Sequence, residues 1–497
     1  MTATLDLDDY RREAEAFLGS IDREYHLHLA GHKPKLELDP IYARHAGLFS
    51  RAAVERLGEL AGDAEDDEGR RRRYLLQFAV DGLLGAATKA EAEEAARLEA
   101  SLELTVDGRS IPYRQVQVEQ ANEAEGERRE GLERERNRML DERLNPLYRA
   151  ALERVHASCV ELGWASYADA YAELRGLDFE RLAGSGREFI QATEDGYAPR
   201  LDPRLAAAGL PPLGGLRRAD IPRFLRAPGL DRGFPAERLV ASFADTLAGL
   251  GFDLDAQRNV HLDTESRATK SPRAFCAAPR VPGEVHLVIS PVGGHDDFAT
   301  LFHEGGHTEH YANTDAALPF EFRHLGDNGV TESFAFLLEH LTEDPQWLRA
   351  RLPEADPEAV GAQARAVRLM FMRRYFAKLD YELELHGRGA ELERMGERYA
   401  SSLEAATRVE WPRETWLADV DEGFYVVCYL RAWALASHWR AGLRERFGER
   451  WFERSEAGRW LRDVWSQGQR LSAEELLEST LGERLDFGRL AAELGSA

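Results

Sequence analysis

The segment HEGGH at residues 303–307 limits the possible structure and function of this chain more than any other segment does. It places two histidines four residues apart, with a glutamate beside them. Phe298, Leu301 and Phe302 precede it at helical spacing, which predicts a helix. Side chains four residues apart project from the same face of a helix. Two imidazoles so placed can hold one face of a tetrahedral zinc ion, and the adjacent Glu304 can take a proton from a metal-activated water. The segment therefore predicts a hydrolytic metal centre.

A third metal ligand is available in segment 327–340, which reads as a second helix rich in apolar residues. Glu332 lies among these residues, and a carboxylate on an apolar helix face is costly unless it is paired or metal-bound. Catalytic zinc usually takes three protein ligands and keeps one position for water. We therefore expect Glu332 to join His303 and His307, with a salt-bridged glutamate as the alternative. His310 is a poor fourth ligand because it lies on the helix that already supplies two.

The stretch from His303 to His310, with Glu332 twenty-five positions after His307 and Glu339 seven positions later, resembles the thimet oligopeptidase and oligoendopeptidase F family of zinc peptidases. The resemblance implies one zinc ion per chain, bound by the two histidines of HEGGH and by Glu332. It also implies that Glu304 is the general base and that Glu339 orients a ligating imidazole from behind.

The same resemblance, which runs from about Arg267 to the C-terminus and is weak before residue 200, implies a fold and an activity. We expect a mostly α, two-lobed metallopeptidase with a deep central cleft and one small β-sheet near the metal helix. We expect it to hydrolyse peptide bonds in short, unstructured oligopeptides. Proline and glycine become frequent at residues 201–235. This favours an N-terminal helical lobe at residues 1–200 and a catalytic lobe at residues 201–497.

The segment from Asp419 to Trp433 departs from the family pattern of a histidine, a glycine-rich turn and two tyrosines that stabilise the oxyanion. Aligned on Gly423 and Trp433, the histidine falls on Asp419 and the tyrosines fall on Phe424 and Arg431. Phe424 cannot donate a hydrogen bond. Losing one oxyanion donor costs about 3 to 4 kcal/mol in a well-studied case, so the substitution bears directly on activity.

Three residues could replace the missing donor. Arg431 could donate from its guanidinium, and Tyr425 or Tyr429 could donate if the alignment slips by one residue. The default interpretation of either tyrosine alone is a core aromatic residue with a satisfied hydroxyl. A weak or unconventional peptidase is the remaining interpretation.

Two other functions stay open. The Taq-type metallocarboxypeptidases are similar in length, helical content and motif spacing, and Arg273, Arg368 and Arg373 are candidates for capturing a substrate carboxylate. A non-catalytic, metal-containing peptide-binding protein is the second alternative. Manganese or cobalt could also replace zinc in such a site.

The composition limits the partners. The net charge of −24 disfavours nucleic acids and anionic membrane surfaces, since like charges repel. No stretch approaches eighteen uninterrupted apolar residues, and the N-terminal segment lacks the pattern of a signal peptide. Three widely spaced cysteines argue against a disulfide framework. We expect a cytoplasmic enzyme that acts on oligopeptides.

Local patterns predict several further elements. Alternating residues around Asp107-Gly108 indicate a β-hairpin, and Gln117 to Arg143 reads as one long exposed helix. Arg273 to Ala278 and Glu284 to Ser290 read as two short strands before the metal helix. An edge strand there could bind an extended peptide through its backbone, or could simply brace the helix.

Overall fold

The computed structural model describes residues 5–62 and 66–495, and it confirms the mostly α fold. The described residues form two compact units, each assembled from three stretches of chain. The first unit comprises Met1–Leu83, Leu230–Gly361 and Arg431–Asp486, and the second comprises Leu84–Gly229, Ala362–Leu430 and Phe487–Ala497. The single boundary that the sequence places near residue 200 falls inside the second unit. The two-lobed shape and the central cleft stay predictions.

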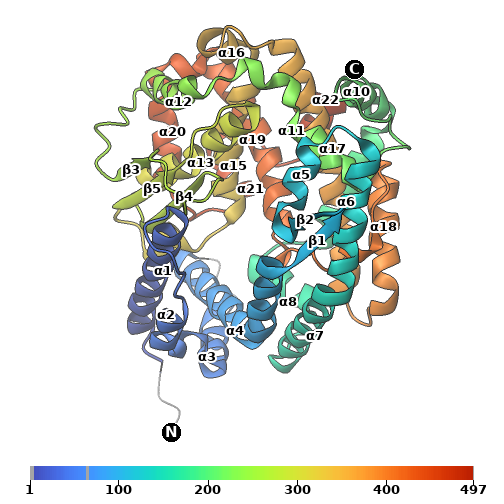
Figure 1. The fold of residues 1–497 in the computed structure, drawn as a ribbon. Helices are drawn as coiled ribbons and strands as arrows, with labels where there is room; N and C mark the ends of the chain where they lie inside the picture. The colour runs from blue at the N-terminus through green and yellow to red at the C-terminus, as the bar shows by residue number, and fades with distance from the viewer. Residues whose placement is uncertain (1–4, 63–65, 496–497) are drawn as a thin grey trace. The chain divides into compact units, whose positions relative to one another are not determined.

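Figure 1 shows the helices and strands along the chain. Helices of the first unit are α1 (Leu7–Leu29), α2 (Asp39–Arg44), α3 (Arg51–Ala61), α12 (Ala236–Gly249), α13 (His295–Asn313), α14 (Phe320–His324), α15 (Asn328–Glu339), α16 (Pro345–Arg351), α20 (Ser455–Trp465) and α21 (Ala473–Leu481). Helices of the second unit are α5 (Val116–Asn122), α6 (Gly126–Met139), α7 (Asn145–Glu161), α8 (Tyr167–Arg175), α9 (Phe179–Ala192), α10 (Glu194–Ala207), α11 (Ile221–Arg226), α18 (Leu392–Thr407) and α22 (Gly488–Gly495). A boundary between the units falls within α4 (Asp67–Ser101), α17 (Pro357–His386) and α19 (Val426–Phe447). In the described part of the chain, no helix combines the length and the apolar character that crossing a membrane requires.

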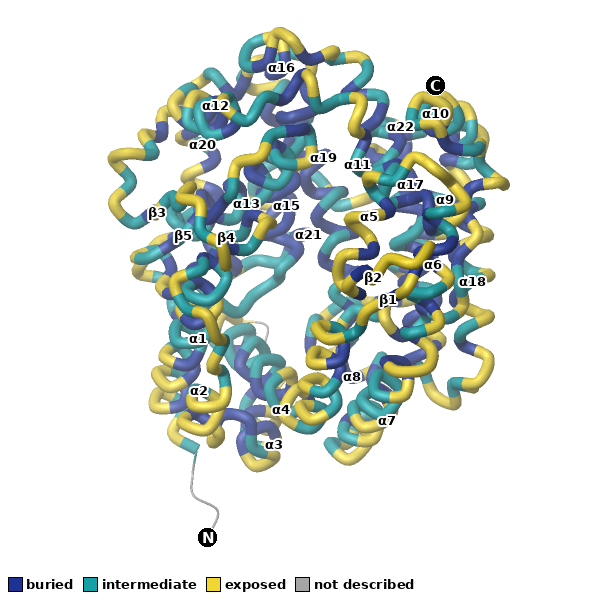
Figure 2. Tube along the Cα trace, in the orientation of Figure 1, coloured by how far each residue is buried: buried dark blue, intermediate teal, exposed yellow. Residues whose placement is uncertain are grey.

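A large apolar core of the first unit surrounds α13, the helix that carries HEGGH. Phe298, Leu301 and Phe302 are fully buried, as their helical spacing predicts, and they belong to one apolar cluster with residues of α12, α15 and α20. Helix α15 is buried from Gly329 to Leu338 (Figure 2). The two helices that carry the candidate ligands therefore lie in the close-packed apolar interior of this unit.

A three-stranded sheet lies against α13 in the first unit (Figure 1). Its strand order is β3 (Val260–Asp263), β5 (Glu284–Val288) and β4 (Phe275–Arg280), with β3 parallel and β4 antiparallel to β5. The sequence predicts β4 and β5, but not β3, which is only four residues long. Strand β4 forms one edge of the sheet, and α1 packs against it. Binding of a peptide to this edge stays a prediction.

Helices α13 and α15 approach each other closely at Gly306. A Cβ atom added there would lie 2.4 Å from the carbonyl oxygen of Phe334 and 2.5 Å from the Cα atom of Ala335. Both are backbone atoms of α15, so the strain could be relieved only by moving one helix away from the other. Glycine at this position is what permits the spacing of the two helices.

The Gly306→Ala variant should therefore be less stable than the wild type, by about 3 kcal/mol, because overpacking against backbone forces a helix to shift. The shift in the urea midpoint of unfolding measures this loss. The control is Gly58→Ala on α3, where no atom lies within 4 Å of the added Cβ atom. This change should leave stability unchanged or raise it by up to about 1 kcal/mol. Equal stability of the two variants would contradict the close approach at Gly306.

The second unit contains the predicted hairpin. Strands β1 (Glu103–Val106) and β2 (Arg109–Pro112) pair antiparallel, with Val106 opposite Arg109. Asp107 and Gly108 form the turn and have φ values of 51° and 74°. A two-residue turn with both φ values positive matches the right-handed twist of the strands, which is why Asp-Gly predicts it.

The single long exposed helix predicted from Gln117 to Arg143 is wrong. The chain forms α5, leaves the helical conformation after Asn122, and starts again as α6 at Gly126. Arg129 on α6 is 2% exposed, and its guanidinium binds the carboxylate of Asp220 at 2.7 Å. One arginine of this charged segment, Arg129, is therefore buried in an ion pair with a residue 91 positions further along the chain.

Candidate metal centre

Helices α13 and α15 bring His303, His307 and Glu332 together, as the sequence predicts. The Oε2 atom of Glu332 lies 3.4 Å from Nε2 of His303 and 3.6 Å from Nε2 of His307. All three ligand atoms lie within 4.8 Å of one another, and this group could hold a metal ion. In the part of the chain that the structure describes, no second group of histidine, cysteine and carboxylate ligands is comparably close.

The distances from Glu332 to the two imidazoles fit a tetrahedral metal. Two ligands that each lie 2.0–2.2 Å from a tetrahedral zinc ion are about 3.3–3.6 Å apart. The two nitrogen–oxygen distances match this edge length closely. Three protein ligands leave a fourth position for water. His310 is not part of the group; it is fully buried, 4.9 Å from the ring of Phe334.

The nitrogen of each imidazole that faces away from the metal position, Nδ1, has a hydrogen-bond partner. Nδ1 of His303 lies 2.8 Å from Oε2 of Glu339, and Nδ1 of His307 lies 2.8 Å from the hydroxyl of Thr331. Donation from Nδ1–H leaves the lone pair of Nε2 directed at the metal position. The contact with Glu339 agrees with the sequence prediction. Thr331 was not predicted, although its place immediately before Glu332 puts it on the same helix turn.

The two carboxylates act strongly on His303. Burial lowers its pKa, but hydrogen bonds and charge from Glu332 and Glu339 outweigh burial and raise the pKa to about 10. Glu332 responds in the opposite sense. Its burial raises the pKa, and the hydrogen bonds to the two imidazoles lower it far below the ordinary value. The candidate ligand set is therefore a strongly coupled cluster of charges.

Replacing Glu339 by Gln should weaken metal binding by about 10- to 100-fold, because a neutral amide holds the Nδ1–H of His303 less strongly than a carboxylate does. Competition with a chromogenic chelator measures the dissociation constant. The matched control is Glu354→Gln, which removes the same charge from an exposed side chain of this unit. A Glu339→Gln variant with wild-type metal affinity would show that the contact with His303 does not tune the site.

Glu304 lies beside the ligands on α13. The backbone N–H of Cys276, on the edge strand β4, donates to Oε2 of Glu304 at 2.8 Å. Burial raises the pKa of Glu304, while the two neighbouring histidines lower it. The net shift is upwards, which makes this carboxylate a better proton acceptor near neutral pH. The strand therefore orients the candidate base relative to the helix that carries it.

Arg431, a candidate oxyanion donor, is engaged with two carboxylates. Its guanidinium binds Asp327 at 3.0 and 2.6 Å and Glu474 at 2.8 Å, and the residue is 2% exposed. Asp327 also caps α15 by accepting from the N–H of Gly329. Arg431 thus braces the start of the helix that carries Glu332, and its role as a donor to substrate stays a prediction.

Tyr425 and Tyr429 belong to the second unit, whereas the metal-binding group belongs to the first. Both are half-buried, and their rings pack edge to face with centroids 5.0 Å apart. Phe424 is fully buried against Phe179 and has a φ of 56°. Asp419, at the family's histidine position, accepts from Tyr399 at 2.7 Å. The catalytic roles of Tyr425 and Tyr429 stay predictions.

The three arginines proposed for carboxylate capture differ in environment. Arg373 is 1% exposed, and its donors bind the carbonyls of Ala406 and Ile190 and the carboxylate of Glu194. Arg368 is also buried, and Arg273 is exposed. Arg373 therefore has the structural role that is the default for such residues, and Arg273 keeps a guanidinium at the surface of the first unit.

Neither the comparison with protein-family models nor the comparison with curated proteins returns a match for this chain. The assignment of function therefore depends on the geometry of the metal-binding group and on the motif resemblance described above.

Proposed function

We propose that this protein is a zinc-dependent metallopeptidase that hydrolyses peptide bonds in short, unstructured oligopeptides. The observation that supports the proposal most directly is the convergence of two imidazoles and one carboxylate within 4.8 Å of one another, with a further carboxylate beside them. Histidine and carboxylate ligands of this kind suit zinc, and manganese or cobalt can substitute. The substrate class follows from the motif resemblance.

The protein's own residues supply binding and proton transfer. His303, His307 and Glu332 would hold the zinc ion, while Glu339 and Thr331 fix the orientation of the two imidazole rings. Zinc bound there would supply Lewis acidity towards a water molecule and the substrate carbonyl. Glu304 takes a proton from the attacking water and then gives it to the leaving amine. The raised pKa of Glu304 suits both steps.

Hydrolysis of a mixed library of short quenched peptides by metal-quantified protein tests the proposal. We expect one zinc ion per chain, cleavage that a chelator abolishes, and recovery when zinc is restored. Fragment masses then distinguish internal cleavage from carboxypeptidase action. One zinc ion per chain with no cleavage in any peptide would refute the enzyme and favour a metal-containing peptide-binding protein.

A further inference from the structure

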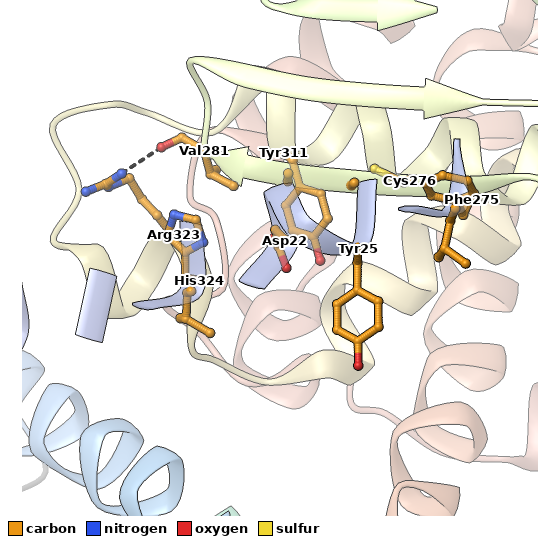
Figure 3. A pocket seen from close by; sticks show the side chains of 12 residues that line it. Asp22, Tyr25, Phe275, Cys276, Val281, Tyr311, Arg323 and His324 are labelled. Carbon is orange, nitrogen blue, oxygen red and sulfur yellow. Dashed lines mark hydrogen bonds between the residues drawn. The ribbon is translucent and has the colours of Figure 1, made fainter. Parts of the chain in front are cut away.

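A cavity of about 410 Å³ lies between α1 and the edge strand β4 in the first unit (Figure 3). This volume is in the range of about 300–1,000 Å³ that is typical of ligand pockets. The cavity adjoins the candidate metal centre. Cys276, which lines it, donates its backbone N–H to Glu304, and Tyr311, which also lines it, follows His307 by one turn of α13. None of the residues assigned above to metal binding or proton transfer lines this cavity.

Asp22 of α1 gives the cavity a negative charge. Its burial raises its pKa to about 6, although a hydrogen bond from the N–H of Ala278 lowers it, so the side chain is ionised at pH 8. Among the described residues, no arginine, lysine or histidine forms an ion pair with Asp22. Figure 3 shows Asp22 and Tyr311 directed into the same part of the cavity.

The two basic residues that line the cavity do not cancel this charge. Arg323 forms an ion pair with Glu15 at 2.6 Å and donates to the carbonyl oxygens of Val281 and Leu318. Burial lowers the pKa of His324 to about 4, so this imidazole is neutral at pH 8. The free charge in the cavity is therefore the carboxylate of Asp22.

The remaining walls suit an aliphatic chain that ends in a cation. Leu18 and Leu29 of α1 and the aromatic rings of Tyr25, Phe275 and Tyr311 line the cavity. Methylene groups bury well against such surfaces, and the faces of aromatic rings attract a cation. A lysine or arginine side chain carries both parts, an apolar stem and a charged end.

Asp22 and Glu304, the candidate base, both accept hydrogen bonds from strand β4, so the strand sets the distance between them. Asp22 accepts from the N–H of Ala278, and Glu304 accepts from the N–H of Cys276. Cys276 and Ala278 are two residues apart, a spacing of about 7 Å in an extended strand, and the register of β4 shifts only beyond Ala277. Two residues of an extended peptide span the same length. A peptide that reaches Glu304 with its scissile bond can therefore place a neighbouring side chain at Asp22.

We propose that this cavity is a substrate subsite that binds a lysine or arginine side chain one or two residues from the scissile bond, with its charged group paired with Asp22. The inference rests on the proposed peptidase function and names a substrate class for it: peptides with a basic residue next to the cleavage site. The positive charge of such peptides also complements the net charge of −24.

The test uses pairs of peptides that differ only in having lysine or norleucine at one position. This position is moved along the peptide from one pair to the next. The metal-loaded Glu304→Gln variant should bind these peptides without cutting them, so fluorescence anisotropy reports affinity even if the wild type hydrolyses nothing. The wild type reports kcat/KM for the same pairs. We expect lysine to be favoured about tenfold at one position, as one charged hydrogen bond provides.

Asp22→Asn, introduced into the wild type and into the Glu304→Gln variant, should abolish the preference for lysine over norleucine. Asp22→Glu should retain this preference. Asp9→Asn, at an exposed position on the same helix, is the control and should change nothing. Equal binding of lysine and norleucine peptides, or a preference that survives Asp22→Asn in a folded, metal-loaded protein, would overturn the subsite. A preference that follows the free N-terminus of the peptide, and disappears on acetylation, would overturn the assignment to a side chain.

Discussion

The Glu304→Gln variant should retain its metal and lose hydrolysis, with kcat lowered by about 10²- to 10⁴-fold. Glutamine has nearly the same shape as glutamate, and its oxygen can still accept the hydrogen bond that the N–H of Cys276 gives at 2.8 Å. It cannot accept a proton from water. The geometry of the site should therefore persist while its proton transfer is removed.

Two measurements on the same sample separate these effects. Elemental analysis gives the zinc content per chain, and the initial rate on a peptide selected from the library gives the activity. Glu354→Gln, an exposed replacement of the same kind, should match the wild type in both. A Glu304→Gln variant with normal turnover would remove Glu304 from the role of base. Loss of zinc together with activity would show that this residue helps to hold the metal.

Glu332→Ala should have the largest effect on metal binding, with affinity lowered by more than the roughly 100-fold that loss of an outer contact can cost. The change removes the carboxylate whose Oε2 atom lies 3.4 and 3.6 Å from the two imidazole nitrogens. Two histidines on one helix then remain, and they cover too little of the coordination sphere to retain zinc against a chelator.

Thermal unfolding with and without zinc provides a second readout. A ligand at 100 times its dissociation constant stabilises the native state by about 2.7 kcal/mol, so zinc should raise the Tm of the wild type. The Tm of Glu332→Ala should not respond at the same zinc concentration, whereas Glu354→Ala should behave like the wild type. A Glu332→Ala variant that keeps one zinc ion per chain after gel filtration would exclude Glu332 as a ligand.

The ligand set could be predicted because each part of it has a local signature. His303 and His307 are related by the periodicity of one helix, and Glu332 was conspicuous as a charged residue within an apolar helix. The pairing of α13 with α15 follows only from the chemistry of a shared metal site, since nothing in the sequence states which helices pack together. The close approach at Gly306 is the physical condition for that pairing.

Other features depend on contacts that no local pattern encodes. Arg129 looked like one of many exposed arginines, and its burial with Asp220 comes from a segment 91 residues away. Asp22 likewise lies on an amphipathic helix with no motif around it, and only the packing of α1 against β4 brings it to the cavity. Strand β3 is too short for its alternation to differ from chance.

The charge cluster around His303 should link metal binding to pH. With a pKa of about 10, His303 carries a proton at neutral pH, so an imidazolium lies between Glu332 and Glu339. A metal ion bound at Nε2 of His303 would displace a proton from this imidazolium. We therefore expect metal affinity to fall as the pH is lowered.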